Sequence, residues 1–206
     1  MTSDYIQYGC GLSCPDGWLN FDASPRLRIE RLPIVRQALG GSGKILFPKG
    51  VRYGDIVRGL PLPDGSAKAV YCSHVLEHID RTSIVTALRN TYRILRPGGV
   101  FRLVVPDLAW RAEEFVSAHG RGDINAADAF MRTCHLGQKE AATGVMKRAR
   151  QVFGNSDHRW MYDEAGMAAL LDRAGFVAIR RCHFGDAEDQ AFSLVENEGR
   201  FVDSGN

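Results

Sequence analysis

The sequence has no long apolar run and no leader-like start. Nowhere in its 206 residues is there a stretch of about 18 consecutive apolar residues, the length that a membrane-spanning helix needs. The beginning of the chain, Met1–Gly11, has neither the basic segment nor the apolar core of a signal peptide. We therefore expect no membrane span, no secretion signal and a cytoplasmic location.

An excess of charge of one sign is also missing. Lys and Arg total 26 against 24 Asp and Glu, for a net charge of +2, so we expect no nucleic-acid partner. Hydrophobic residues make up 45% and charged residues 24%, which excludes a disordered chain, a collagen-like fibre and a coiled-coil rod. The length favours a single domain over residues 1–206.

Cysteine is sparse and does not form a pattern. The five cysteines are irregularly spaced, at Cys10, Cys14, Cys72, Cys134 and Cys182. An odd number without regular spacing favours reduced thiols over a disulfide framework. Cys10 and Cys14 lack neighbouring ligands that would complete a zinc site.

What the sequence does contain is an alternation of strand-like and helix-like segments. Strands are expected at residues 5–8, 18–21, 51–56, 69–72 and 100–105, and helices at 25–39, 82–95 and 164–173, with a less regular helical stretch at 108–150. Two closing strands are expected at 177–184 and 192–196. This order predicts an α/β fold with a mostly parallel sheet, helices on both faces and an antiparallel closing strand.

Ligands of such folds bind beyond the carboxyl ends of the strands. The residues that follow the five expected strands are Gly9-Cys10-Gly11, Asp22, Asp55-Ile56, Ser73-His74 and Pro106-Asp107. Glycines let a ligand approach the backbone, and an acidic residue after the second strand can accept both ribose hydroxyl protons. Either feature alone is common, but their ordered occurrence at five strand ends is a much stronger indication of a ligand site.

At these positions the chain resembles the class I S-adenosylmethionine-dependent methyltransferases, which have a Rossmann-like fold. The resemblance depends on LPLPDGS at 60–66, AVYCSHVLEHI at 69–79 and YRILRPGGVFRLVVPD at 92–107, together with Gly9-Cys10-Gly11 and GWLNFD at 17–22. Only residues 12–17 separate the glycine loop from the second strand, where the family usually has a full helix. This shortening is similar to compact methyltransferases associated with the modification of sugars and surface glycans.

The resemblance implies the following contacts with S-adenosylmethionine. Gly9, Cys10 and Gly11 would lie against the methionine part, Asp22 would bind the ribose, Asp55 and Ile56 would meet the adenine, and Ser73 and His74 would line the pocket under the sulfonium.

One motif has a second interpretation. His74, Glu77 and His78 match the H-x-x-E-H pattern of some zinc proteases. That chemistry needs both histidines on one face of a helix and a third ligand, and the sequence supplies neither. We expect no metal, and Glu77 and His78 instead would brace the following loop.

A methyltransferase that acts on a hydroxyl needs a group that takes the proton. His158 is a candidate because it lies in a polar loop beside Trp160 and Tyr162, which could form a wall for the acceptor. Asp107 is a second candidate or an orienter of His158, with helix capping as the structural alternative. His74 is the third.

The expected function is methyl transfer to a small-molecule or glycan-like acceptor, at a hydroxyl oxygen. Two alternatives stay open: a non-catalytic, cofactor-binding partner subunit, and an enzyme of this fold that uses the cofactor for other chemistry. The sequence is compatible with a homodimer. A nicotinamide dehydrogenase is disfavoured because Gly9-Cys10-Gly11 lacks the third glycine and the helix start that hold a pyrophosphate.

Overall fold

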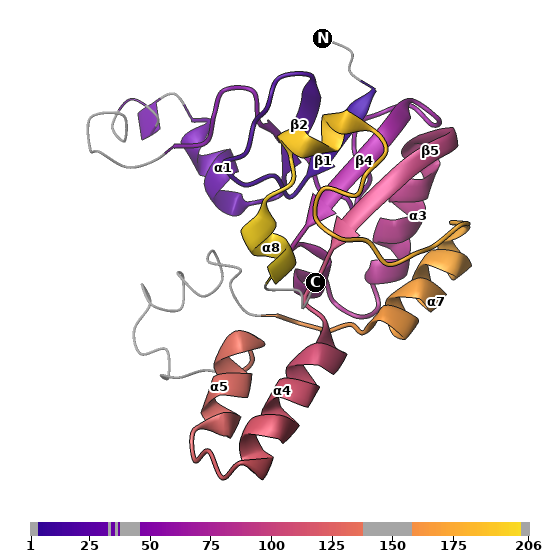
Figure 1. Ribbon diagram of the computed structural model, residues 1–206. Coiled ribbons are helices and arrows are strands. Elements are labelled where there is room, and N and C mark those ends of the chain that lie inside the picture. Colours follow the sequence, from indigo (N-terminus) through magenta and orange to yellow (C-terminus); the bar gives the residue numbers. More distant parts are fainter. Residues whose placement is uncertain (1–3, 33, 36, 38–45, 138–157, 203–206) are drawn as a thin grey trace.

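A parallel sheet forms the centre of the molecule. The computed structural model describes residues 4–32, 34, 35, 37, 46–137 and 158–202. Within these residues five strands pair in parallel, in the order β3-β2-β1-β4-β5 (Figure 1). The strands are β1 (Tyr5–Tyr8), β2 (Trp18–Asp22), β3 (Arg52–Tyr53), β4 (Ala67–Ser73) and β5 (Leu95–Val104).

The helices begin and end at residues suited to those positions. They are α1 (Pro25–Glu30), α3 (Ile84–Ile94), α4 (Leu108–Gly120), α5 (Ala126–Thr133), α7 (Glu164–Ala174) and α8 (Glu198–Val202), with 3₁₀ turns η1 (Leu76–His78) and η2 (Gln190–Leu194). Asp163 caps α7 by accepting a hydrogen bond from the amide of Gly166, and Gly175 ends it with a φ of 102°.

Both faces of the sheet are covered. One face packs on α3 and α7 through a cluster that includes Val70, Cys72, Ile84, Leu88, Leu170 and Leu171. Figure 1 shows these two helices on the same side of β4 and β5. The opposite face packs on the C-terminal segment through Trp18, Tyr71, Phe192, Val195 and Phe201. β4 lies between the two layers, which explains its almost continuous apolar sequence.

The prediction of two closing strands is wrong. In the described residues every strand pair is parallel, residues 177–184 form no strand, and most of the 192–196 segment belongs to η2. Ala178 has a φ of 52°, outside the β region, and the side chain of Val177 is 87% exposed. The apolar residues of this stretch therefore do not form a buried strand face.

Other bounds differ from expectation in smaller ways. Only two residues of the expected 51–56 strand pair, as β3, and α1 stops at Glu30, while part of its expected extension lies outside the described residues. β5 begins already at Leu95, so Pro97-Gly98-Gly99 lies within the strand instead of ending the helix. The register between β4 and β5 shifts at this point, which accommodates the glycines. In the described part of the chain, no helix is both long and apolar enough to cross a membrane.

One buried arginine attaches the C-terminal segment to the sheet. Arg102 lies near the carboxyl end of β5 and is 4% exposed. Its guanidinium donates to Glu196, to Asp186 Oδ1 at 2.7 Å and to the carbonyl oxygen of His183 at 2.6 Å. Side-chain bonds therefore hold residues 183–196 where a strand ladder was expected.

Removing this guanidinium should destabilise the fold strongly. Arg102→Ala leaves the buried carboxylate of Glu196 without its partner, and we expect it to lower the free energy of unfolding by about 3–5 kcal/mol. The matched control is Arg96→Ala, which breaks an exposed pair with Asp4 and should cost less than about 1 kcal/mol. Urea unfolding measures both, and equal losses would contradict this role of Arg102.

Candidate active site

The strand order places a topological switch point at β1, and its loops lie at the carboxyl end of the sheet. β1 pairs with β2 on one side and with β4 on the other. The order of the strands in the sheet therefore reverses its direction at β1. Ligands bind at such a switch point in open α/β sheets. Tyr8 is in register with Phe21 and with Cys72, so the loops after β1, β2 and β4 start at the same level.

Asp22 joins two of these loops. Its Oδ2 accepts a hydrogen bond from the amide of Gly11 at 2.9 Å, and its Oδ1 accepts one from the amide of Ser24 at 2.7 Å. The residue is 8% exposed, so the carboxylate is largely enclosed by the backbone that it organises. Each carboxylate oxygen has a second acceptor site, which leaves capacity for a ligand hydroxyl.

The two glycines of the first loop have different surroundings. A Cβ on Gly9 would lie 2.0 Å from Cγ2 of Val75, so the loops after β1 and β4 touch there. A Cβ on Gly11 would meet no atom of the described residues within 4 Å, and the φ of 55° at Gly11 favours glycine. The open side of the loop is therefore at Gly11, next to the carboxylate of Asp22.

The remaining expected cofactor contacts are less open. Cys10 is buried, and burial raises the pKa of its thiol. The side chain of Ile56 lies in the core, and its carbonyl oxygen accepts from Asn90 Nδ2 at 2.8 Å. Asp55 caps the next turn by accepting from the amide of Val57 and lies 3.6 Å from Arg58. Ser73 ends β4 at the crevice.

His74, directly after β4, is held from two sides. Its φ of 53° is uncommon for a non-glycine residue, and its amide donates to the carbonyl oxygen of Val104 at 2.9 Å. Ring atom Nε2 lies 3.0 Å from the carbonyl oxygen of Arg200, and Nδ1 lies 3.3 Å from Oε1 of Glu77. A carbonyl oxygen only accepts, so Nε2 of His74 carries the hydrogen.

The backbone of Glu77 brings His158 to the same place. Its carbonyl oxygen accepts hydrogen bonds from the amides of Arg159 and Trp160, at 2.8 and 3.1 Å. His158 Nε2 then lies 4.0 Å from Oε1 of Glu77, and His158 Nδ1 lies 3.1 Å from the sulfur of Met161. Burial, the largest cause, lowers the pKa of His158 to about 4, so the ring is neutral at neutral pH.

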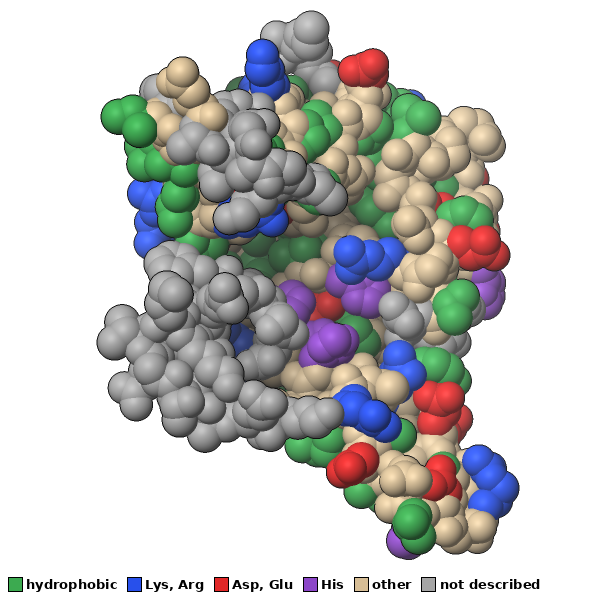
Figure 2. Space-filling view, turned by 90° about the vertical axis from the view of Figure 1, so that its left-hand side faces the viewer, with side chains coloured by type: hydrophobic (Ala, Val, Ile, Leu, Met, Phe, Trp, Pro, Cys, Tyr) green, Lys and Arg blue, Asp and Glu red, His purple; other side chains and the backbone are tan. Residues whose placement is uncertain are grey.

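Further histidines surround the same carboxylate. The ring centroid of His158 lies 5.1 Å from that of His78 and 4.9 Å from that of His135. We call Glu77, His74, His78, His135 and His158 the histidine cluster. Figure 2 shows histidine side chains and an acidic side chain gathered in a hollow of one face. The sequence drew attention to each motif residue but not to this convergence, and it gave no signal for His135.

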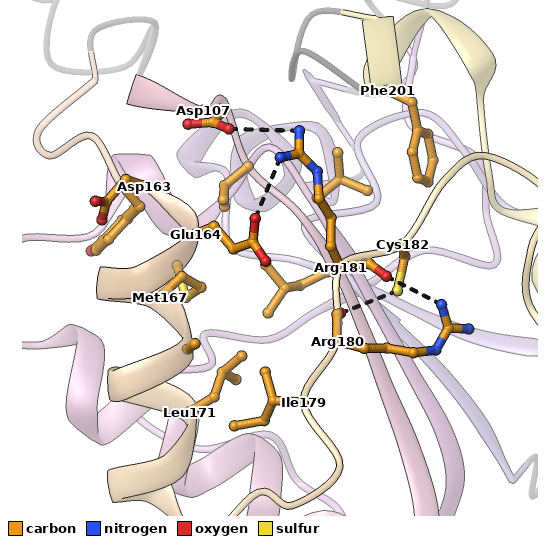
Figure 3. A pocket seen from close by; sticks show the side chains of 15 residues that line it. Asp107, Asp163, Glu164, Met167, Leu171, Ile179, Arg180, Arg181, Cys182 and Phe201 are labelled. Atoms are coloured by element: carbon orange, nitrogen blue, oxygen red, sulfur yellow. Dashed lines mark hydrogen bonds and ion pairs between the residues drawn. The ribbon is translucent and has the colours of Figure 1, made fainter. Parts of the chain in front are cut away.

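Asp107 lies elsewhere. It caps α4 by accepting from the amide of Ala109, and its Oδ2 lies 3.8 Å from Arg181, which also pairs with Glu164 at 3.3 Å. These side chains line a cavity of about 180 Å³ between the end of β5, α7 and residues 179–182 (Figure 3). Neither His74 nor His158 lines it, so the structure does not unite Asp107 with the histidine cluster.

Trp160 and Tyr162, which were expected to contact the acceptor together, lie in different environments. Trp160 is 47% exposed, with the guanidinium of Arg81 5.7 Å from its ring centroid. Tyr162 instead belongs to the core, and burial raises the pKa of its hydroxyl to about 12. Only Trp160 therefore stays available at the surface beside His158.

Comparison with known families decides the class of this site. Residues 19–103, which run from β2 through β5, match the family model of the methyltransferase domain. The match agrees with the resemblance to class I S-adenosylmethionine-dependent methyltransferases and supports the enzyme class and the cofactor that the resemblance implies. It covers Asp22, Ser73 and the H-x-x-E-H motif, whereas His158 lies outside it.

Solved methyltransferase structures are similar at low identity. A methyltransferase of Thermotoga maritima is 18% identical, with a TM-score of 0.44, over 84% of this chain and 63% of that chain. PigF with S-adenosylhomocysteine is 17% identical, with a TM-score of 0.43, over 85% and 45%. Phosphoethanolamine N-methyltransferase 2 of Haemonchus contortus is 12% identical, with a TM-score of 0.44, over 95% and 37%. The chain thus spans less than two thirds of these proteins, and no curated protein matches it.

The open side of Gly11 gives a direct test of where the cofactor lies. Gly11→Ala places a methyl group in the space beside Asp22, so we expect S-adenosylmethionine affinity to fall at least about 10-fold, as measured by calorimetry. Gly17→Ala is the matched control because it also has a positive φ and open space around the added Cβ. Both changes cost about 1–2 kcal/mol of backbone strain. Equal affinities of the two variants would contradict a cofactor at Gly11.

Proposed function

We propose that the protein transfers the methyl group of S-adenosylmethionine to a hydroxyl oxygen of a small-molecule or glycan-like acceptor. The observation that carries this proposal is the placement of two kinds of group at one sheet edge. Gly11 and Asp22 follow β1 and β2, and the histidine cluster follows β4. We further propose that residues 1–206 are one domain, with no nucleic acid as partner; a homodimer and a cytoplasmic location stay predictions.

The residues at the switch point fit the cofactor. Open space at Gly11 suits the methionine part, and the spare acceptor sites of Asp22 suit two ribose hydroxyls. The contact of Val75 with Gly9 narrows the crevice on the β4 side, so the ligand would lie towards β2. When bound, the cofactor supplies a methyl group on a positively charged sulfur, which is open to attack from the opposite side.

The chain itself has to orient the acceptor and promote loss of its proton. His158 is suited to this because its Nδ1 faces the sulfur of Met161, which can only accept a hydrogen bond. The proton of the neutral ring therefore sits on Nδ1, and the lone pair of Nε2 is directed towards the cluster. Asp107 supports this reaction less well because its carboxylate is engaged by the α4 cap and by Arg181.

Removing the ribose contact should weaken cofactor binding without unfolding the protein. We expect Asp22→Ala to lose about 1.5–3 kcal/mol of binding free energy for S-adenosylmethionine, the usual range for charged hydrogen bonds. The loop at Gly11 will loosen too, because Asp22 holds its amide. Asp16→Ala, an exposed acid in the same segment, is the control and should bind normally. Calorimetry that finds no binding by the folded wild-type protein would refute the function itself.

Removing the ring of His158 should slow methyl transfer. We expect His158→Ala to lower methyl transfer by about 10²–10⁴, the usual cost of losing a group that promotes proton removal, while cofactor affinity stays near normal. The assay follows labelled methyl from the cofactor into a library of hydroxyl acceptors. His119→Ala, an exposed change on α4, is the control. Normal turnover of His158→Ala would contradict the assignment, and cofactor binding without transfer to any acceptor would favour a non-catalytic partner subunit.

A further inference from the structure

The geometry points to a divalent metal site formed by Glu77, His78 and His158, with Zn²⁺ as the ion that its chemistry fits. The site is defined by one carboxylate oxygen of Glu77 and one ring nitrogen of each histidine, and these three atoms all lie within 4.8 Å of one another. The inference rests on the proposed function for its role and changes one part of it: with the ion bound, the lone pair of His158 Nε2 would be a metal ligand, and the ion would promote loss of the acceptor proton in place of the free ring. The binding of the ion itself does not require methyl transfer.

The spacing of the ligand atoms suits one ion. Zinc lies about 2.0–2.2 Å from imidazole nitrogens and carboxylate oxygens, so tetrahedral ligand atoms are about 3.4 Å apart. The ligand atoms now lie within 4.8 Å of one another, so binding of the ion would draw them closer together. Glu77 and His78 come from η1, and His158 comes from a segment that is distant in sequence. The site therefore takes Glu77 and His78 from the H-x-x-E-H motif. His158, and not His74, is the second histidine ligand.

The carboxylate of Glu77 needs a positive partner. Glu77 is fully buried, and neither of its carboxylate oxygens has a hydrogen-bond partner among the residues that the structure describes. A buried carboxylate is costly unless it is paired or binds a metal. Two ring nitrogens lie close to Oε1: Nδ1 of His74 at 3.3 Å and Nε2 of His158 at 4.0 Å.

The hydrogen positions of those histidines favour a cation between them. Nε2 of His74 donates to Arg200, and Nδ1 of His158 faces the sulfur of Met161, so in the neutral rings both remaining nitrogens present lone pairs to Glu77. Lone pairs facing a carboxylate repel it. A divalent ion coordinated by Oε1 and by Nε2 of His158 removes this repulsion, whereas a hydrogen-bonded pair would need an additional proton.

The backbone holds the ligands before any ion binds. The two amides that follow His158 donate to the carbonyl oxygen of Glu77, and the amide of His158 donates to the carbonyl oxygen of His135 at 3.3 Å. The amide of His78 donates to the carbonyl oxygen of Val75 at 3.0 Å within the turn that starts η1. Ligand positions fixed by main-chain bonds lower the entropy cost of binding an ion.

The ligand set selects the type of ion and leaves room for a further ligand. Two imidazoles and one carboxylate are the protein ligands of catalytic zinc sites, in which water or substrate takes the fourth position. Mg²⁺ prefers oxygen ligands and should bind poorly. Figure 2 shows histidine side chains in a hollow of this face, and an oxygen of the acceptor would reach the open position from there.

The test is titration of Zn²⁺ into the full chain after removal of metals by a chelator. Calorimetry should show one strong site for Zn²⁺ and none for Mg²⁺. Glu77→Gln and His158→Ala should each weaken Zn²⁺ binding at least about 100-fold, since the loss of a ligand exceeds the 10- to 100-fold cost of losing an outer partner. His119→Ala, which lies outside the cluster, should bind as the wild type does.

Each outcome of this titration either supports or overturns the zinc site. The proposal is overturned if the wild-type protein shows no one-to-one zinc site, or if His158→Ala binds Zn²⁺ with wild-type affinity. The result for His158→Ala is sufficient even if Glu77→Gln does not fold. A Co²⁺-loaded sample should lack the thiolate absorption band that binding at Cys14 or Cys182 would give. Cofactor affinity is measured on the same preparation. Zinc binding without S-adenosylmethionine binding would refute the function alone, and the reverse result would refute the metal site alone.

Discussion

The contact on which the site depends is made by the carbonyl oxygen of Glu77. It accepts the amides of Arg159 and Trp160 and thereby fixes a segment from late in the sequence against the turn after β4. The stretch then continues to Tyr162, whose carbonyl oxygen accepts the amide of Leu108 at the start of α4. Two main-chain contacts thus place His158 between the ends of β4 and β5. Without them the histidine cluster would have no fixed geometry.

The glycine loop and the histidine cluster are linked through the same turn. Val75, which precedes η1, packs against Gly9, while Asp22 holds Gly11 from the other side. The short connection between β1 and β2 therefore does not leave a loose loop. One side of it is set by Val75 in the β4 turn and the other by the carboxylate of Asp22.

Much of the fold could be predicted because burial leaves a direct trace in the sequence. The bounds of β4 were predicted to within two residues and those of α7 to within one. β4 is apolar on both faces, and α7 repeats Met167, Leu170, Leu171 and Ala174 on one side. The closing strands were wrong because a few apolar residues near Val177 look alike in a strand and in a coil. What decides between them is Arg102, whose buried ion pairs depend on residues far away in the chain.

The site could be predicted only in part, for the same reason. Strand ends meet at one edge in any parallel sheet, so the neighbourhood of Gly11, Asp22 and His74 followed from the alternation of elements. The meeting of Glu77 with His158 did not, because main-chain hydrogen bonds between distant segments have no pattern in side-chain type. The same holds for Asp107, whose partner Arg181 comes from a stretch that had been expected to be a strand.

The attachment of the C-terminal segment by side chains has a consequence for the inner face of the crevice. Arg102 fixes Glu196, α8 follows directly, and the carbonyl oxygen of Arg200 in α8 holds the ring of His74. The segment is therefore joined to the sheet both by ion pairs and by the buried apolar cluster around Phe192 and Phe201. The position of His74 in the site thus depends on a residue 126 positions later in the chain, so a substitution in α8 can alter the site without touching any strand.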